Sequence, residues 1–207
     1  MTKHLQKKEP CVGCVLMASG ASVRFGEENK LLAELHRQPM VTHILSTLDN
    51  VRQSLLSETL HIVVVCEAPR VERLAQDAGF DTLCAPHPLQ SDTVRDGLSY
   101  LLSCHGALDG CMFVAADQPF LTAESILRLL AQFAAEPSHP CRLAYRDDRI
   151  TPGNPVIFPA AMFDALLSLT GDHGGGTLLK DKKPAFVFVP DKRELLDIDT
   201  PADFDLF

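Results

Sequence analysis

The sequence lacks both a long apolar run and an excess of basic residues. Of its 207 residues 46% are hydrophobic and 22% are charged, with a formal net charge of −8 at pH 7. A membrane-spanning helix needs about 20 consecutive apolar residues, so we expect no membrane partner. An acidic balance also argues against nucleic acid as a nonspecific partner, because phosphates repel it. A local basic site for phosphates is still compatible with this composition.

A disulfide framework is also absent from the pattern of cysteines. There are seven cysteines, an odd number, and they are scattered through apolar segments. This usage is typical of small buried hydrophobes in a reducing compartment, so we expect a cytoplasmic protein. Cys11 and Cys14 form a C-x-x-C without a second pair, and Cys14 lies in an apolar run. Ordinary packing is therefore favoured over a zinc or redox role.

No internal repeat, low-complexity segment or long linker divides the chain. We expect a flexible tail over residues 1–10 and one domain over residues 11–207. The basic N-terminus before the apolar run Val12–Ala18 imitates a short signal peptide. Cleavage near Ala21 would remove the first strand and its loop, so the mature protein is expected to keep this segment.

The first apolar run ends in a loop of small residues that differs from the common phosphate-binding motifs. Lys30 follows Gly26 by four residues, so the loop is no P-loop, and the G-x-G-x-x-G spacing is missing too. A buried strand that leads into such a loop nevertheless brings backbone N–H groups close to an anion. Arg24 and Lys30 supply two cations. The loop therefore predicts a phosphate site.

Strands and helices alternate through the first two thirds of the chain. This alternation predicts a three-layer α/β/α domain around a mostly parallel sheet. After Pro140 we expect shorter strands at 143–146 and 156–158, interrupted by a Pro-Gly-Asn-Pro segment. A helix over 160–169, strands at 186–189 and 195–198 that complete the sheet, and a short helix from Pro201 should follow. We expect close packing to explain Gly97, which lies inside a predicted helix.

Acidic side chains follow two of the predicted strands. Asp117 follows the strand at 111–116, and Asp197 and Asp199 bracket the end of the last one. Ligands of parallel sheets bind beyond the carboxyl ends of the strands, so Asp117 and Asp199 can meet there. Two carboxylates beside a phosphate site suit Mg²⁺. Paired acids can also serve glycosidic chemistry, but the neighbouring loop favours metal and phosphate. For Asp203 and Asp205 a turn or cap role is preferred.

Five segments in order resemble one family, the nucleotidyltransferases that act on molybdopterin. Met17–Leu32 is similar to the L-A-A-G-x-S-x-R-F-G-x-x-K-L-L signature, and Ala115–Pro119 to an A-D-Q-P element. Gly153–Pro159 resembles G-x-P-V-x-F-P, Gly171–Gly174 resembles G-D-x-G, and Asp197–Asp203 resembles D-I-D-T-P-x-D. These matches cover nearly the whole chain from about Val12.

The resemblance implies a Rossmann-like fold of the nucleotide-diphospho-sugar transferase type and Mg²⁺-dependent transfer of NMP from an NTP to a phosphate. Ala18-Ser19-Gly20 and the A-D-Q-P element are closer to the cytidylyl branch than to the guanylyl branch. The implied reaction joins CTP to molybdenum-molybdopterin, giving molybdopterin cytosine dinucleotide and pyrophosphate. A transient contact with a client molybdoenzyme is a further implied partnership.

The same resemblance, together with the chemistry of phosphoryl transfer, suggests a role for each matched residue. The catalytic group comprises Lys30, Arg24 and Asp117. The nucleotide-binding group comprises Ala18, Ser19, Gly20, Ala21, Ser22, Arg24, Lys30 and Ser91. The metal ligands are Asp117 and Asp199, with Asp197 second. Asn154, Asp172 and His173 are assigned to the pterin side.

The chain departs from the family pattern at Leu89–Val94, where cytidylyltransferases carry a stretch like G-M-S-S-S-L. Asp92 there either brings a negative charge close to a polyanion or caps the following helix, and we favour the cap. Two alternative functions are kept. One is the same chemistry on a sugar or alditol phosphate. The other is a pterin-binding chaperone with weak or no catalysis, for which the altered stretch is the best support.

Overall fold

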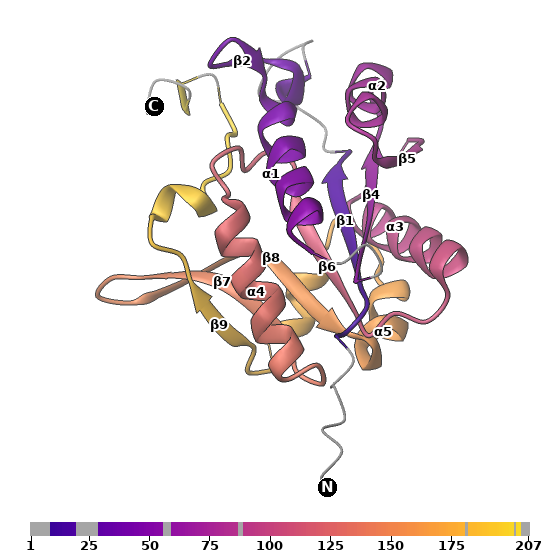
Figure 1. Ribbon diagram of the computed structural model, residues 1–207, viewed down its shortest axis with the longest axis vertical. Coiled ribbons are helices and arrows are strands. Elements are labelled where there is room, and N and C mark those ends of the chain that lie inside the picture. Colours follow the sequence, from indigo (N-terminus) through magenta and orange to yellow (C-terminus); the bar gives the residue numbers. More distant parts are fainter. Residues whose placement is uncertain are drawn as a thin grey trace, which may run out of the picture.

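A seven-stranded sheet runs through the middle of the protein, and helices cover both of its faces (Figure 1). The computed structural model describes residues 9–19, 29–55, 59–86, 89–180, 182–200 and 202–203. The strand order is β5-β4-β1-β6-β8-β7-β9, and only β8 runs against the others. The strands are β1 (Val12–Ala18), β4 (Leu60–Cys66), β5 (Asp81–Cys84), β6 (Gly110–Ala115), β7 (Cys141–Arg146), β8 (Ile150–Pro159) and β9 (Ala185–Phe188). The mostly parallel sheet confirms the predicted fold class.

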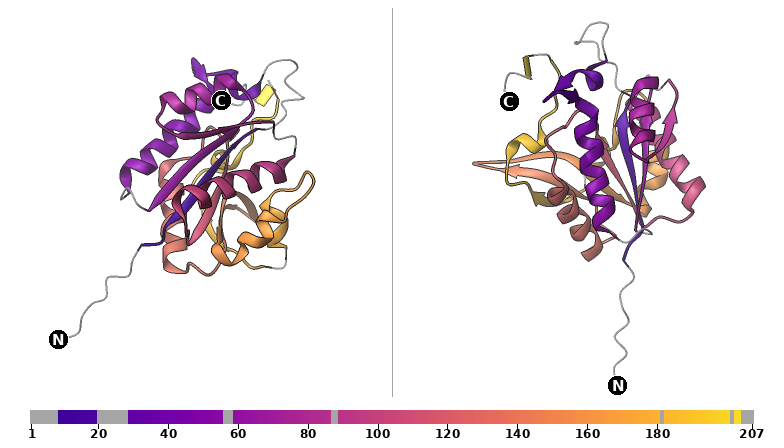
Figure 2. Two further views of the ribbon diagram at one scale, coloured as in Figure 1. Left: turned by 90° about the vertical axis from the view of Figure 1, so that its right-hand side faces the viewer. Right: turned by 45° about the horizontal axis from the view of Figure 1, so that its top comes forward.

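Two hydrophobic cores, one on each face of the sheet, make the three layers. The first core joins the sheet to α1 (Met40–Ser54), α2 (Pro69–Asp77) and α4 (Ala123–Ala135). The second joins it to α3 (Gln90–His105) and α5 (Phe163–Leu167). The left view of Figure 2 shows helices on the two sides of the sheet. A small hairpin, β2 (Glu34–Leu35) with β3 (Gln38–Pro39), precedes α1.

The central position of β1 explains its composition. β1 pairs with β4 on one side and β6 on the other, so its backbone is fully paired and both faces are covered. Such a strand reads as a continuous apolar run. Cys14 in this strand is fully buried. Burial raises the pKa of its thiol, which therefore stays protonated and packs as a small hydrophobe.

Helix boundaries follow local signals that the sequence displays. Thr122 caps α4, because its hydroxyl accepts the N–H of Ser125. Pro69 opens α2, and Gly79 follows it at φ +76°, a conformation that only glycine adopts without cost. The first helix, α1, begins at Met40, directly after Pro39, and runs to Ser54.

Two expectations about the later strands were wrong. β8 is one strand of ten residues that runs through the Pro-Gly-Asn-Pro segment instead of stopping there. Ala144 and Pro152 pair in its ladder with β7, and an irregularity between Arg142 and Ala144 accommodates the prolines. Residues 195–198 form no strand. A 3₁₀ helix, Lys192–Leu195, precedes an extended segment that lies against Asp117 instead of extending the sheet.

The expected helix over 160–169 divides into two shorter pieces. Ala160–Met162 is a 3₁₀ turn, and α5 covers Phe163–Leu167. Further 3₁₀ turns lie at Lys30–Leu32 and Gly175–Leu179. The expected start of the last helix, Pro201, lies outside the described residues. Within the part of the chain that the structure describes, no helix is long and apolar enough to cross a bilayer.

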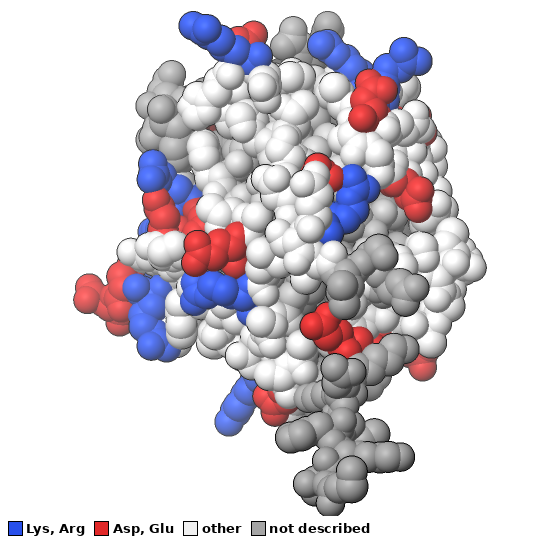
Figure 3. Space-filling view, viewed as in Figure 1, with Lys and Arg blue, Asp and Glu red and all other residues white. Residues whose placement is uncertain are grey.

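Acidic and basic side chains are interspersed on the face of the molecule that Figure 3 shows, with wide uncharged areas between them. Several of them lie around the projecting β7–β8 hairpin, where Arg146, Asp147, Asp148 and Arg149 are exposed. This mixed pattern differs from the single-sign surface that steers polyanions toward a protein.

Gly97 provides a test of the packing between α3 and the sheet. A Cβ at this position would lie 2.6 Å from a γ-methyl carbon of Val15 and 3.0 Å from one of Val65, both fully buried. The close packing expected there is confirmed. Gly97→Ala should lower the free energy of unfolding by about 1–2 kcal/mol, since overpacking outweighs the gain in helix propensity.

Chemical denaturation of Gly97→Ala beside Gly176→Ala measures this effect. Among the residues that the structure describes, nothing lies within 4 Å of a Cβ at Gly176, so the same chemical change should be nearly neutral there. Equal stability of the two variants would contradict the packing explanation.

Candidate functional site

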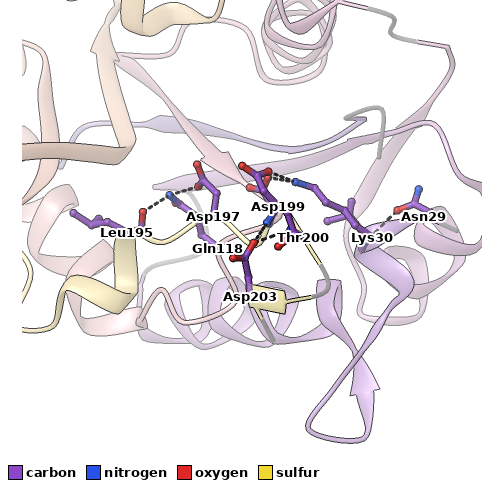
Figure 4. A network of polar contacts seen from close by, with 10 residues as sticks. Asn29, Lys30, Gln118, Leu195, Asp197, Asp199, Thr200 and Asp203 are labelled. Atoms are coloured by element: carbon purple, nitrogen blue, oxygen red, sulfur yellow. Dashed lines mark hydrogen bonds and ion pairs between the residues drawn. The ribbon is translucent and has the colours of Figure 1, made fainter. Parts of the chain in front are cut away.

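The ammonium group of Lys30 contacts two carboxylates that are far apart in the sequence, and Figure 4 shows it pointing toward Asp199. Its Nζ donates to Asp117 Oδ2 at 2.6 Å and to Asp199 Oδ1 at 3.1 Å. Lys30 stands at the start of a 3₁₀ turn, where the side chain of Asn29 caps the backbone by accepting the N–H of Leu31. Asp117 directly follows the end of β6. The expected meeting of Asp117 and Asp199 at the carboxyl edge of the sheet is therefore present.

Asp199 reaches this position because residues 196–199 dock on the turn after β6. The N–H of Ile198 donates to the carbonyl oxygen of Asp117 at 2.9 Å. The side-chain amide of the buried Gln118 donates to Asp197 Oδ1 at 2.8 Å. Asp203 Oδ2 accepts the N–H groups of Asp199 and Thr200. This last contact confirms the turn role preferred for Asp203, whereas Asp205 lies outside the described residues.

A buried glutamate anchors the same C-terminal segment to the start of α4. Glu194 is only 3% exposed. Its Oε2 accepts the backbone N–H of Thr122 at 3.1 Å and the Thr122 hydroxyl at 2.6 Å. A carboxylate at a helix N-terminus is favourable because it satisfies backbone donors and opposes the helix dipole. Glu194 thus holds the segment that carries Asp197 and Asp199.

The electrostatics of the cluster are unusual at two groups. Burial alone would lower the pKa of Lys30, but the charges and hydrogen bonds of Asp117 and Asp199 raise it above its ordinary value. Asp197 behaves in the opposite way to an ordinary surface acid. Burial, and then the negative charge of Asp117, raise its pKa to about 6. Three carboxylates therefore share the field of one ammonium group.

This donor set can be compared with what Mg²⁺ requires. Among the described residues, no group of three His, Cys, Asp or Glu side chains forms a complete metal cage. Mg²⁺ usually needs only one or two protein carboxylates, because water and substrate phosphates complete its octahedron. The carboxylates of Asp117 and Asp199 converge on one cation, and the pKa of Asp197 responds to both. The residues therefore fit such an ion.

A cavity of about 850 Å³ opens beside the cluster, on the face of the sheet that α3 and α5 cover. Asp117 belongs to both the cluster and the cavity wall. An apolar floor comes from the sheet and α3, whereas the rim is polar. Its lining includes Met17, Ser19, Leu89, Gln90, Thr93, Val94, Phe113, Ala115, Arg142, Asn154, Val156, Phe158, Asp172, His173 and residues 174–177. The three residues assigned to the pterin side, Asn154, Asp172 and His173, all line it.

The loop that carries Asp172 and His173 closes on the first turn of α3. Asp172 Oδ1 accepts the backbone N–H of Gln90 at 3.3 Å. A Cβ at Gly174 would lie 2.7 Å from the Gln90 side chain, and one at Gly175 would lie 2.8 Å from the Phe158 ring. The glycines therefore allow the loop to lie directly against helix and sheet. Asp172 binds a helix terminus that Leu89, its N-cap residue, leaves without a side-chain cap.

The altered stretch at Leu89–Val94 also connects to the first strand. A hydrogen bond of 2.5 Å joins the Thr93 and Ser19 hydroxyl oxygens, both buried. Ser91, assigned to the nucleotide, is 1% exposed and does not line the cavity. Asp92 is not the helix cap that was favoured. It lies in the first turn of α3 and accepts a hydrogen bond from Arg95 at 2.7 Å.

The described residues include only part of the predicted nucleotide loop. Ala18 is the last residue of β1, Ser19 follows it, and both are buried, whereas Gly20, Ala21, Ser22 and Arg24 lie outside the described residues. Three residues of the site were missed from the sequence, namely Thr93, Gln118 and Arg142. Gln118 belongs to the A-D-Q-P element, so its motif was a usable signal. For Thr93 and Arg142, only the tertiary structure reveals their places.

Comparison with known proteins gives a family for most of the chain. Residues 14–185 match the family model described as the MobA-like NTP transferase domain. The 2-C-methyl-D-erythritol 4-phosphate cytidylyltransferase of Dehalococcoides mccartyi strain 195 is 27% identical over 96 residues, which are 45% of this chain and 41% of that protein. The enzyme of the same name from strain CBDB1 is 28% identical over 56% of this chain and 49% of its own. The chain thus matches less than half the length of these curated relatives.

Solved structures resemble the whole domain at lower identity. Rv0371c from Mycobacterium tuberculosis H37Rv has a TM-score of 0.74 at 22% identity, covering 95% of this chain and 97% of that one. Its manganese complex has a TM-score of 0.70 at 20% identity, covering 95% and 97%. CMP:2-keto-3-deoxy-manno-octonic acid synthetase complexed with CTP has a TM-score of 0.71 at 13% identity, covering 95% and 96%. At these identities the similarity shows the fold alone.

The raised pKa of Asp197 predicts how stability depends on pH. In the unfolded chain an aspartate titrates near about 3.9, and in the folded protein Asp197 titrates at about 6. The folded state thus binds this proton more tightly, and its contribution to stability is lost as pH rises through about 6. Asp197→Asn has no carboxyl group to titrate and does not lose this stability. The melting temperature of the variant minus that of the wild type should therefore increase from pH 4 to pH 8.

Thermal melts of both proteins across this range measure the difference. Asp191→Asn is the matched control, because hydrogen bonds from Arg193 lower the pKa of Asp191 and reverse the sign. A melting difference for Asp197→Asn that does not change with pH would contradict the assignment.

Proposed function

Because the chain belongs to the MobA-like NTP transferase domain family, we propose that it transfers CMP from CTP to the terminal phosphate of molybdenum-molybdopterin. The products are molybdopterin cytosine dinucleotide and pyrophosphate. The observation that carries the proposal is Lys30, bonded to Asp117 and Asp199 at the edge of a large cavity. A cation and two carboxylates beside a ligand-sized cavity suit the binding and transfer of a nucleotide phosphate.

The reaction needs little acid or base chemistry from the protein. A phosphate monoester of the acceptor is already anionic, so it attacks the α-phosphorus of CTP without a strong general base. Positioning and charge neutralisation then provide most of the catalysis. We assign Lys30 to the charge that develops on the transferring phosphate. Arg24 and the backbone N–H groups of residues 18–22 are assigned to the triphosphate.

Asp117 and Asp199 would hold Mg²⁺, with Asp197 as a second-rank ligand, and the bound ion would neutralise the triphosphate oxygens. The manganese complex of the Mycobacterium tuberculosis protein supports a divalent ion on this fold. The CTP complex of the synthetase supports CTP as the nucleotide. Gln118, Asp203 and Glu194 keep the acidic groups in place through the contacts described above.

A second candidate keeps the chemistry and changes the acceptor to a sugar or alditol phosphate. The similarity to 2-C-methyl-D-erythritol 4-phosphate cytidylyltransferases favours it. An assay of pyrophosphate release with CTP and Mg²⁺ distinguishes the two candidate functions. Molybdenum-molybdopterin and 2-C-methyl-D-erythritol 4-phosphate are offered as the acceptor in turn. Release only with the pterin supports the proposal, and release only with the alditol phosphate replaces it. GTP, ATP and UTP in the same assay test the base preference.

Asp117→Asn should lower turnover at least about hundred-fold, as expected for the loss of a charged group that acts in the transition state. The backbone carbonyl that holds Ile198 is unchanged, so the variant should stay folded. Asp92→Asn is the matched control, since Asp92 pairs with Arg95 and does not line the cavity. Turnover and thermal melting of both variants give the comparison. Wild-type turnover in Asp117→Asn would remove Asp117 from the mechanism.

Lys30→Met tests the metal assignment with a measurement other than activity. Without the ammonium group, Asp117 and Asp199 face each other with no shared cation, so added Mg²⁺ should stabilise the variant more than the wild type. The melting temperature is measured against Mg²⁺ concentration, with Na⁺ at equal ionic strength as control. Identical Mg²⁺ responses would count against these ligands. Turnover of Lys30→Met should fall about 10²- to 10³-fold.

A further inference from the structure

Arg142 is a half-buried cation on the cavity floor that the sheet forms. Its Nε and Nη2 donate to the carbonyl oxygen of Gly153 at 3.0 and 2.8 Å. Within the described part of the chain, no carboxylate forms an ion pair with it. Burial accordingly lowers its pKa below the usual arginine value, although an arginine stays charged at any physiological pH.

Partial burial of the Arg142 guanidinium without a counter-charge among the described side chains is unfavourable, and the packing of the fold does not require it. A buried charge normally has a counter-charge, because transfer out of water is unfavourable. Arginine has five N–H donors, and Gly153 occupies only one edge of the guanidinium plane. Both bonds to one oxygen fix the plane, so the remaining donors are held in a set direction. A fixed and underused guanidinium suits recognition of a planar or anionic group.

The strand register shows which part of a ligand Arg142 can reach. Arg142 pairs with Val156 of β8, and Val156 pairs with Phe113 of β6. Two strand spacings, about 10 Å, therefore separate the backbone of Arg142 from β6. Asp117 lies four residues beyond Phe113, at the carboxyl edge. Arg142 is thus remote from Lys30 and from the place assigned to the transferring phosphate.

The surroundings of Arg142 indicate the chemistry of the group it binds. Phe113, Val156 and Phe158 belong to the apolar floor of the cavity, and Asn154 offers an amide beside them. Apolar walls with a few fixed polar groups are typical of sites for small organic ligands. A flat ring can pack against this apolar floor, and an oxygen atom on its edge can accept a hydrogen bond from the guanidinium.

We infer that Arg142 is a specificity-determining residue that binds a carbonyl or anionic oxygen of the acceptor, at the end remote from the attacking phosphate. This inference rests on the proposed function, because it needs a nucleotidyltransferase with two substrates. It adds a residue that holds the acceptor without taking part in the charge changes at Lys30 and Asp117.

Steady-state kinetics of Arg142→Gln test the inference. The KM for the acceptor should rise about ten- to hundred-fold, as expected for a lost charged hydrogen bond, while the KM for CTP stays within about two-fold. Arg142→Lys retains the charge and should lie between the wild type and Arg142→Gln. Arg146→Gln is the matched control, since Arg146 is on the same strand but exposed and stacked on Phe188 outside the cavity.

Equilibrium binding of molybdenum-molybdopterin, 2-C-methyl-D-erythritol 4-phosphate and CTP, each measured separately, supplies the second readout. Acceptor binding that weakens in Arg142→Gln with CTP binding intact supports the inference, whichever acceptor binds. Weakened CTP binding with an unchanged acceptor would overturn it and place Arg142 at the nucleotide. If the wild type turns over an acceptor and Arg142→Gln has the same KM for it, this inference is overturned and the proposed function is not. If the wild type neither binds nor turns over any acceptor, both proposals fall.

Discussion

The contact between Ile198 and Asp117 is the constraint on which the site depends. One backbone hydrogen bond of 2.9 Å places the C-terminal segment on the turn after β6. This bond helps to hold Asp199 beside Asp117, so that Lys30 has two carboxylate partners. The buried Glu194 at the start of α4 and the amide of Gln118 secure the same segment from two sides. Segments distant in sequence therefore form one charged cluster.

The charged cluster and the cavity floor lie at different places on the sheet. The cluster of Lys30, Asp117 and Asp199 lies at the carboxyl edge of the parallel strands, the usual ligand edge of such sheets. The cavity continues from there over β6, β8 and β7, where the antiparallel β8 brings Asn154 beside Arg142. Phosphate chemistry at the edge and acceptor recognition on the face would then depend on different residues. Such a separation would let one fold serve different acceptors.

Several parts of this arrangement are readable from local sequence. The apolar runs of β1 and β4, the Thr122 cap and the Pro69 start follow from short-range rules, and each is present in the structure. The prediction failed where tertiary pairing overrides local signals. Prolines in residues 152–155 indicated a break, but pairing with β7 keeps β8 continuous. Residues 195–198 looked like a strand because they are apolar, yet their polar partners are Asp117 and Gln118 instead of a neighbouring strand.

The sequence by itself determined the fold class, the family-like motifs and the acidic residues that follow the strands, because periodicity and spacing are local properties of the chain. The meeting of Asp117 and Asp199 was expected from the strand ends, but only the tertiary structure decided the other contacts of the site. It placed Asp172 on the first turn of α3, paired Asp92 with Arg95, and buried Ser91 away from the cavity. It also brought Arg142 into the cavity, since a strand residue gains its surroundings from the elements that pack over the sheet. The bonds of Lys30 to Asp117 and Asp199, which lie 87 and 169 residues away, form only because the fold brings these segments together.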